Sequence, residues 1–184
     1  DVEREVAKRL QVRLRHPEAF GRYNVAPTQD VPVVVQDRDG RRDELMRWGL
    51  VPFWAKAVGG RALINARAET VAGSSTFGRL VERGSHRCLV LADGFYEWIA
   101  AEDPRQPRQP VHFSLADGAS FCFAGLWTTW RGELRSCTVV TTVANELIAP
   151  AVAPLLAPLP AGGMRLAHAN PVVNAADYEG PDCL

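Results

Sequence analysis

The sequence predicts an α+β fold: a single domain over residues 1–184, built on a curved, mainly antiparallel and barrel-like β-sheet with a few short helices. Short β-branched and apolar runs recur along the chain with turn residues between them, and only one long stretch has helical spacing. The 184 residues, with 47% hydrophobic and 23% charged side chains, are typical of one soluble domain with its own core.

The first expected element is an amphipathic helix over residues 2–14. Asp1 is a suitable N-cap for it. Apolar side chains follow at four-residue spacing, which places them on one helical face: Val2, Val6, Leu10 and Leu14. An ordered loop is expected at residues 22–29, because Asn24 and Pro27 favour turns over regular structure.

The β-branched run at residues 33–35 predicts the first strand of a hairpin, and Pro32 before it suits a strand's first residue or an edge. Residues 37–40 supply the turn before a second strand that runs to Trp48. Residues 50–87 have little periodicity and are expected to form a long connection with one short helix. Further strands, separated by turn residues, are expected at residues 88–91, 111–115, 120–127 and 134–142.

Charge is uneven along the chain, although its 21 basic and 21 acidic residues cancel. Zero net charge argues against bulk attraction to nucleic acid but allows a local basic groove. Residues 56–87 hold six basic and two acidic side chains, a local charge of +4. This stretch is either a solvated face or a groove that follows a phosphate backbone. Trp48, Trp54 and Trp98 are either core residues or stacking platforms worth ~1–3 kcal/mol per base.

Residues 64–70 alternate apolar and polar side chains, which predicts a half-buried strand. Its polar face would present Asn65, Arg67 and Glu69 together. An asparagine can orient a reacting group, and an arginine can hold a phosphate with two hydrogen bonds. The alternative is a surface contact between Arg67 and Glu69, which would contribute little to stability.

Residues 92–98 form the second polar candidate. Gly94 permits a bend that redirects the following side chains. Glu97 lies between Tyr96 and Trp98, and an apolar setting would disfavour its ionised form and suit it to proton transfer. The alternative is a structural carboxylate beside a hairpin, and the residue types do not decide between the two.

No metal or cofactor is expected. The four histidines are not at metal-ligand spacing, the four cysteines form no C-x-x-C pair, and no phosphate-binding or dinucleotide-binding glycine motif occurs. Apolar surroundings of the cysteines favour free thiols in a reducing, cytoplasmic setting. No apolar run approaches the ~20 residues of a membrane span, and the charged first residues are not a signal peptide.

Several of these segments, in this order, resemble the SOS response-associated peptidase (SRAP) family. The resemblance covers nearly the whole chain, and long motifs in a fixed order are more specific than any one of them. The motifs lie at residues 22–29, 48–55, 64–70, 87–98, 123–127, 141–145 and 173–182.

The resemblance implies an abasic-site sensor, a monomer whose partner is single-stranded DNA and which becomes nucleoid-associated when bound. In the family, autoproteolytic removal of the initiator methionine exposes an N-terminal cysteine. Its α-amine and thiol form a Schiff base and then a thiazolidine with the opened abasic sugar. By motif, Asn65 and Glu97 correspond to residues that assist this reaction. The DNA-binding positions implied by the resemblance are Asn24, Pro27, Trp48, Arg67, Trp98 and Thr142.

Two family segments have no counterpart in the sequence. The family begins Met-Cys-Gly-Arg, where this chain begins at Asp1, and none of its four cysteines is N-terminal. A family His-x-Arg-Met-Pro segment is also missing near residues 149–154, and His168 does not match it. Either both segments belong to a longer chain, or the protein is a non-catalytic single-stranded DNA-binding module without its nucleophile.

Overall fold

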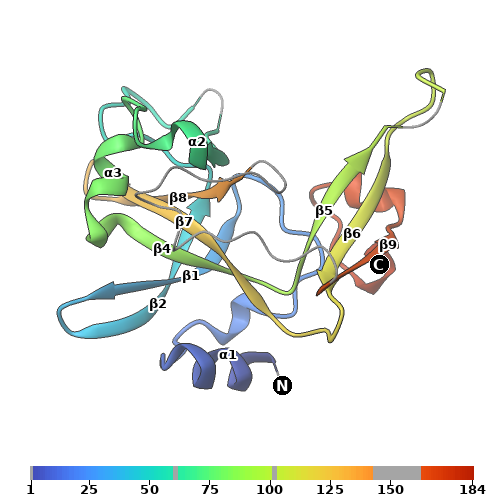
Figure 1. The fold of residues 1–184 in the computed structure, drawn as a ribbon, viewed down its shortest axis with the longest axis horizontal. Coiled ribbons are helices and arrows are strands. Elements are labelled where there is room, and N and C mark those ends of the chain that lie inside the picture. The colour runs from blue at the N-terminus through green and yellow to red at the C-terminus, as the bar shows by residue number, and fades with distance from the viewer. Residues whose placement is uncertain (1, 60–61, 101–102, 143–162) are drawn as a thin grey trace.

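The computed structural model describes residues 2–59, 62–100, 103–142 and 163–184 (Figure 1). Its helices are α1 Val2–Leu10, α2 Ala68–Val71 and α3 Gly78–Glu82, with short 3-10 turns η1 Pro17–Ala19, η2 Gly84–His86, η5 Pro171–Asn174 and η6 Pro181–Cys183. Its strands are β1 Asp30–Asp37, β2 Gly40–Trp48, β3 Asn65–Arg67, β4 Arg87–Ala92, β5 Gly94–Ile99, β6 Gln109–Leu115, β7 Phe121–Trp130, β8 Leu134–Thr141 and β9 Met164–His168.

The larger sheet closes on itself. Its strand order is β2-β1-β4-β7-β8-β3, and β2 also pairs with β8. The pairing of β2 with β8 that closes the sheet is parallel. It is short, since only Arg47 and Trp48 take part, opposite Ser136 and Cys137. The pairs β1–β2, β1–β4, β4–β7 and β7–β8 are all antiparallel. The predicted α+β fold with a curved, mainly antiparallel, barrel-like sheet is therefore confirmed.

The barrel core follows from alternation along the strands, which sends every second side chain to the same face. Inward-facing residues of β1, β2, β4 and β8 fill the interior: Val31, Val33, Val35, Met46, Cys88, Val90, Cys137 and Val139. Helix α1 covers the outer face through Val6, which packs with Val34 and Leu91. Val71 of α2 and Leu80 of α3 cover another outer patch.

A second sheet, β5-β6-β9, is antiparallel throughout and extends away from the barrel (Figure 1). The chain reaches it by continuing from β4 into β5 through Asp93 and Gly94. Gly94 is required at this bend, because a Cβ there would lie 2.0 Å from Nε2 of His112 and 2.8 Å from the carbonyl oxygen of Phe113. A second glycine, Gly49 with φ of 127°, lets the chain leave the barrel where β2 ends.

Four local predictions differ from the structure. Helix α1 ends at Leu10 rather than residue 14, because Gln11 takes a φ of 52° that an α-helix cannot continue. Pro32 lies inside β1 rather than before it. It is not among the residues of β1 that pair with β4, so this part of the strand resembles an edge, where a missing N–H is tolerated. The strand expected at residues 64–70 is only β3, which turns into α2 at Ala68. Two strands were not predicted: β5, whose residues were interpreted as a bend and a polar site, and β9, whose sequence is not rich in β-branched residues.

Within the described residues, no helix is long and apolar enough to cross a membrane.

Candidate functional site

Strand β3 places Asn65 and Arg67 on one exposed face. The strand pairs in parallel with β8, with Asn65 opposite Val139 and Arg67 opposite Thr141. Asn65 and Arg67 are exposed, while Ala66 between them is buried against the cluster that includes Val71 of α2. The two polar side chains therefore share a face, as predicted. Glu69 does not extend that row, because it lies in α2.

Thr142 and Trp48 lie beside this strand. Thr142 directly follows β8 and is half-buried, one residue beyond the partner of Arg67. Trp48 is also half-buried: it packs against the barrel core, and its Nε1 donates to the carbonyl of Ile64 at 3.1 Å. Trp48 is therefore partly a core residue, and only its exposed portion is available to a ligand.

The loop at residues 22–29 is held at the end of β2. The backbone N–H of Thr28 donates to the carbonyl of Trp48 at 2.7 Å, and that of Trp48 donates to the carbonyl of Gln29 at 2.8 Å. Pro27 and Thr28 are exposed at the loop tip. Thr28 has a φ of 78°, an uncommon conformation for a β-branched residue, and such strain clusters at functional sites.

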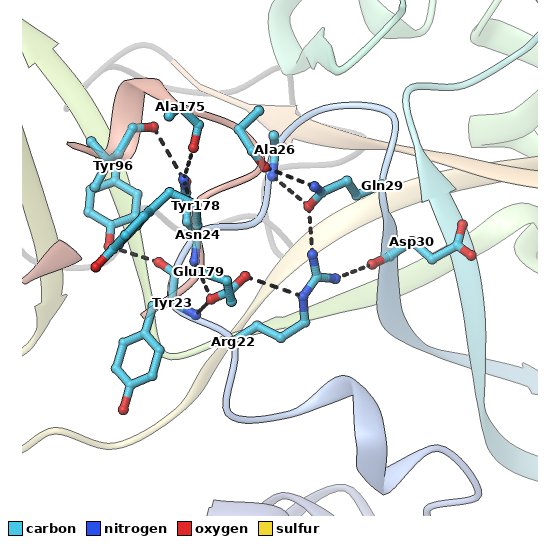
Figure 2. A network of polar contacts seen from close by, with 12 residues as sticks. Arg22, Tyr23, Asn24, Ala26, Gln29, Asp30, Tyr96, Ala175, Tyr178 and Glu179 are labelled. Atoms are coloured by element: carbon cyan, nitrogen blue, oxygen red, sulfur yellow. Dashed lines mark hydrogen bonds and ion pairs between the residues drawn. The ribbon is translucent and has the colours of Figure 1, made fainter. Parts of the chain in front are cut away.

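Asn24, predicted to bind DNA, has a buried side chain. Only 5% of its surface is exposed. Its Nδ2 donates to the carbonyls of Val173, Ala175 and Tyr178 at 3.3, 2.9 and 3.1 Å, and Figure 2 shows this network. The amide therefore joins the loop to the end of the chain in this structure, and a DNA contact through Asn24 stays a prediction.

Strand β5 carries Glu97 away from its aromatic sequence neighbours. Glu97 is exposed, and alternation turns its side chain to the face opposite Tyr96 and Trp98. The apolar setting that the sequence predicted for Glu97 is therefore absent, because residues adjacent in a strand point to opposite faces. Trp98 is 39% exposed, and its Nε1 donates to Oδ1 of Asn174 at 2.8 Å, which orients the indole. Among the described residues, no hydrogen bond or ion pair links Glu97 to Asn65.

The other face of β5 holds a half-buried pair, Tyr96 and His112, whose rings lie 5.1 Å apart. Burial, with smaller contributions from Cys183 and Asp93, raises the pKa of Tyr96 to about 12. Its neutral hydroxyl donates to the carbonyl of Tyr23 at 2.8 Å. Burial lowers the pKa of His112, and the charge of Asp93 only partly opposes this.

Acidification is expected to destabilise the protein partly through His112. Because its folded pKa is lowered, the unfolded chain binds the proton more readily. The stabilising contribution is complete above the ordinary histidine pKa of about 6.5 and is lost as the pH falls through the folded value. Replacing His112→Gln should therefore reduce the fall in Tm between pH 7 and pH 5. His168→Gln, at an exposed site on β9, is the control; an equal reduction there would contradict the assignment.

The four cysteines are free thiols, and burial raises the pKa of three of them. Cys88, Cys137 and Cys183 are buried. Burial raises the pKa of the Cys88 and Cys122 thiols, and it raises that of Cys137 to about 12. No cluster of three or more histidine, cysteine, aspartate or glutamate residues is arranged to hold a metal ion there.

Comparison with known proteins decides the family. The family model described as SOS response associated peptidase (SRAP) matches residues 2–152. The chain belongs to the SRAP family. Abasic site processing protein YoaM of Bacillus subtilis strain 168 is 40% identical over 131 residues, 68% of this SRAP chain and 56% of YoaM. Abasic site processing protein YedK of Escherichia coli K12 is 33% identical over 149 residues, 79% of this chain and 60% of YedK.

The matches thus span less than two thirds of these relatives' own lengths. Among solved structures, a Bordetella bronchiseptica protein superimposes with a TM-score of 0.63 at 22% identity, covering 85% of this chain and 94% of that one. A Bacteroides thetaiotaomicron protein gives 0.63 at 21% identity, covering 79% and 75%. At these identities the likeness shows that the SRAP chain shares their fold.

The polar network around Glu179 was not predicted. Oε1 of Glu179 accepts hydrogen bonds from the backbone N–H groups of Tyr23 and of Asn24, the latter at 2.9 Å (Figure 2). Its Oε2 lies 3.7 Å from Nε of Arg22. The contact joins positions about 155 residues apart, which no local pattern reveals.

Proposed function

We propose that this SRAP chain binds single-stranded DNA and senses abasic sites; the names of its relatives, which are abasic site processing proteins, support the abasic site as the target. The observation that carries the proposal is the pair of exposed side chains on β3, Asn65 and Arg67. The side chain of Arg67 makes no hydrogen bond or ion pair with other described residues, so its guanidinium is available to a phosphate. Pro27, Trp48, Trp98 and Thr142 would add contacts to bases and sugars.

The proposed reaction forms a covalent thiazolidine between the abasic sugar and an N-terminal cysteine, which these 184 residues do not include. In a chain that begins with cysteine after removal of methionine, the neutral α-amine attacks the sugar aldehyde. Loss of water gives a Schiff base, and the thiol then adds to its carbon. An α-amine has an ordinary pKa of about 7.7–8.0, so part of it is nucleophilic at neutral pH. Asn65 would orient the sugar, and Glu97 would transfer protons.

A covalent adduct on a denaturing gel tests the proposal. The full-length protein should link to single-stranded DNA that carries one abasic site and should leave the intact strand free. The second candidate, a non-catalytic DNA-binding module, rests on the buried or internal cysteines described above. It predicts reversible, salt-sensitive binding of both strands without any adduct. Absence of an adduct with normal binding would favour this second function.

Replacing Arg67→Ala should weaken binding to intact and abasic strands alike. A lost phosphate contact lowers the slope of log K against log salt by about 0.7 for single strands. Fluorescence anisotropy at several salt concentrations measures both quantities. Arg38→Ala, an exposed arginine between β1 and β2, removes the same charge elsewhere and is the control. An equal change at both positions would mean that only net charge matters.

A further inference from the structure

The end of the chain packs between the barrel loop and the second sheet. Residues 170–184, called the strap below, include the short turns η5 and η6. Cys183 within it is fully buried, and the carbonyl of Cys183 accepts from the N–H of Asn170 at 3.2 Å. The N–H of Ala169, the residue just before the strap, donates to the carbonyl of Pro110 on β6 at 3.1 Å. The strap is therefore anchored to the sheet that carries Glu97.

One side of the strap holds the loop at residues 22–29. The buried amide of Asn24 donates to three strap carbonyls, and Glu179 accepts from two backbone N–H groups of the loop. Gln29 adds a bond from Nε2 to the carbonyl of Ala176 at 3.1 Å. Among these groups the amide of Asn24 is buried, and a buried polar group that loses its partners is destabilising, so the three bonds from Asn24 resist separation of the loop from the strap.

The strap's other side holds β5. Asn174 accepts from Nε1 of Trp98, and Tyr96 on the same strand donates to the carbonyl of Tyr23 in the loop. Trp98 and Tyr96 are the neighbours of Glu97 on either side. Fixing both of them fixes the position of Glu97 on the opposite face of the strand.

We propose that the strap is a positioning element: it sets β5, and with it Glu97, against the loop that contacts the end of β2. Glu179 is its positioning residue and acts through the backbone of the loop, not by touching the substrate. This inference rests on the proposed function, because it assigns the strap to the same reaction. Misplacement of a reacting group by 1 Å can slow a reaction by about 10²-fold, so the strap matters to rate more than to DNA affinity.

The test compares Glu179→Ala with Glu179→Gln in the full-length protein. Alanine removes the acceptor for two N–H groups, whereas glutamine keeps an oxygen in its place. At saturating abasic single-stranded DNA, Glu179→Ala should slow single-turnover linkage about 10-fold with little change in affinity. Glu179→Gln should retain most of the wild-type rate. A wild-type rate in Glu179→Ala would overturn the proposal.

Asp43 provides a more stringent control, because its carboxylate is buried whereas that of Glu179 is exposed. Its buried carboxylate also joins distant backbone, accepting from the N–H groups of Arg15 and His16 at 2.8 and 2.9 Å, but it does not contact the strap. Asp43→Ala should lower Tm without slowing linkage by the folded protein. If it slows linkage as much as Glu179→Ala does, the strap has no positioning role.

Hydrogen exchange separates failure of this inference from failure of the proposed function. In Glu179→Ala, amides of β5 should exchange faster than in wild type, whether or not any adduct forms. Unchanged exchange in β5 would refute the proposed role of the strap in positioning β5, even if the wild-type protein links to abasic DNA. Faster exchange together with unchanged linkage would also refute its positioning role. If wild-type protein forms no adduct, the proposed reaction fails, and exchange in β5 alone decides whether the strap holds that strand.

Discussion

Replacing Glu97→Gln is expected to slow covalent linkage to abasic DNA by about 10²–10⁴-fold, the usual contribution of a positioned acid or base. Glutamine keeps the shape of the side chain but cannot exchange a proton with the forming Schiff base. Because Glu97 is exposed on β5, the substitution should leave both the fold and the DNA affinity close to wild type. Single-turnover linkage, fluorescence anisotropy and thermal melting of the full-length variant measure the three properties.

Glu82→Gln is the matched control for this experiment. Glu82 is also an exposed glutamate, at the end of α3 within the basic stretch of the chain. The same loss of charge there should leave linkage unchanged. If Glu97→Gln instead lowers Tm while the folded protein links DNA at the wild-type rate, Glu97 is a structural residue of the hairpin and has no part in the reaction.

Replacing Gly94→Ala is expected to destabilise the protein by about 3 kcal/mol, the upper end of ordinary overpacking. The new Cβ would lie 2.0 Å from Nε2 of His112 and 2.8 Å from the carbonyl oxygen of Phe113. The imidazole can rotate away, but the carbonyl belongs to the paired strand β6 and cannot move without breaking its ladder. For a protein of this size the expected fall in Tm is roughly 6–12 °C.

Two comparisons make the Gly94 result specific. In the His112→Ala background, Gly94→Ala should cost less than it does alone, because one of the two close contacts is then absent. Gly84→Ala is the control, since a Cβ at Gly84 meets nothing within 4 Å and its backbone is not left-handed. A Tm loss below about 2 °C for Gly94→Ala would mean that β5 and β6 do not approach each other so closely at the bend.

Local pattern was sufficient for most of the barrel. The valines of β1 alternate between the interior and α1, which is what a strand buried on both faces requires. The same alternation placed Asn65 and Arg67 on one face of β3. The alternation also predicted a longer strand, to residue 70, than the observed β3, which ends at Arg67. Apolar residues at Ala66 and Ala68 suit the start of a helix as well as a strand.

Contacts between distant segments could not be predicted in this way. Asn24 lies in a loop with a proline nearby and has the composition of a surface turn. Its burial depends on three carbonyls that lie 149 to 154 residues further along the chain. The exposure of Glu97 has a similar cause: the sequence shows its neighbours Tyr96 and Trp98, but the pleat separates their faces. Pairing of β2 with β8, which closes the barrel, is likewise a tertiary contact.

The way in which β2 and β3 share a neighbour bears on how this fold can evolve. Trp48 and Asn65 pair with residues of β8 only two positions apart. Leu50 and Leu63 form an isolated bridge, so the chain leaves and rejoins the barrel at a single point. The cost of closing a loop grows with the logarithm of its length, and doubling residues 51–62 would cost only about 0.6 kcal/mol. The first residues of that segment are held to the barrel, because the N–H of Val51 donates to Oγ of Ser136 at 2.9 Å and Nε1 of Trp130 donates to the carbonyl of Ala55 at 2.8 Å. Insertions, whether natural or engineered, are therefore expected to be tolerated at the exposed residues 57–59, where they would leave both the barrel and these contacts unchanged.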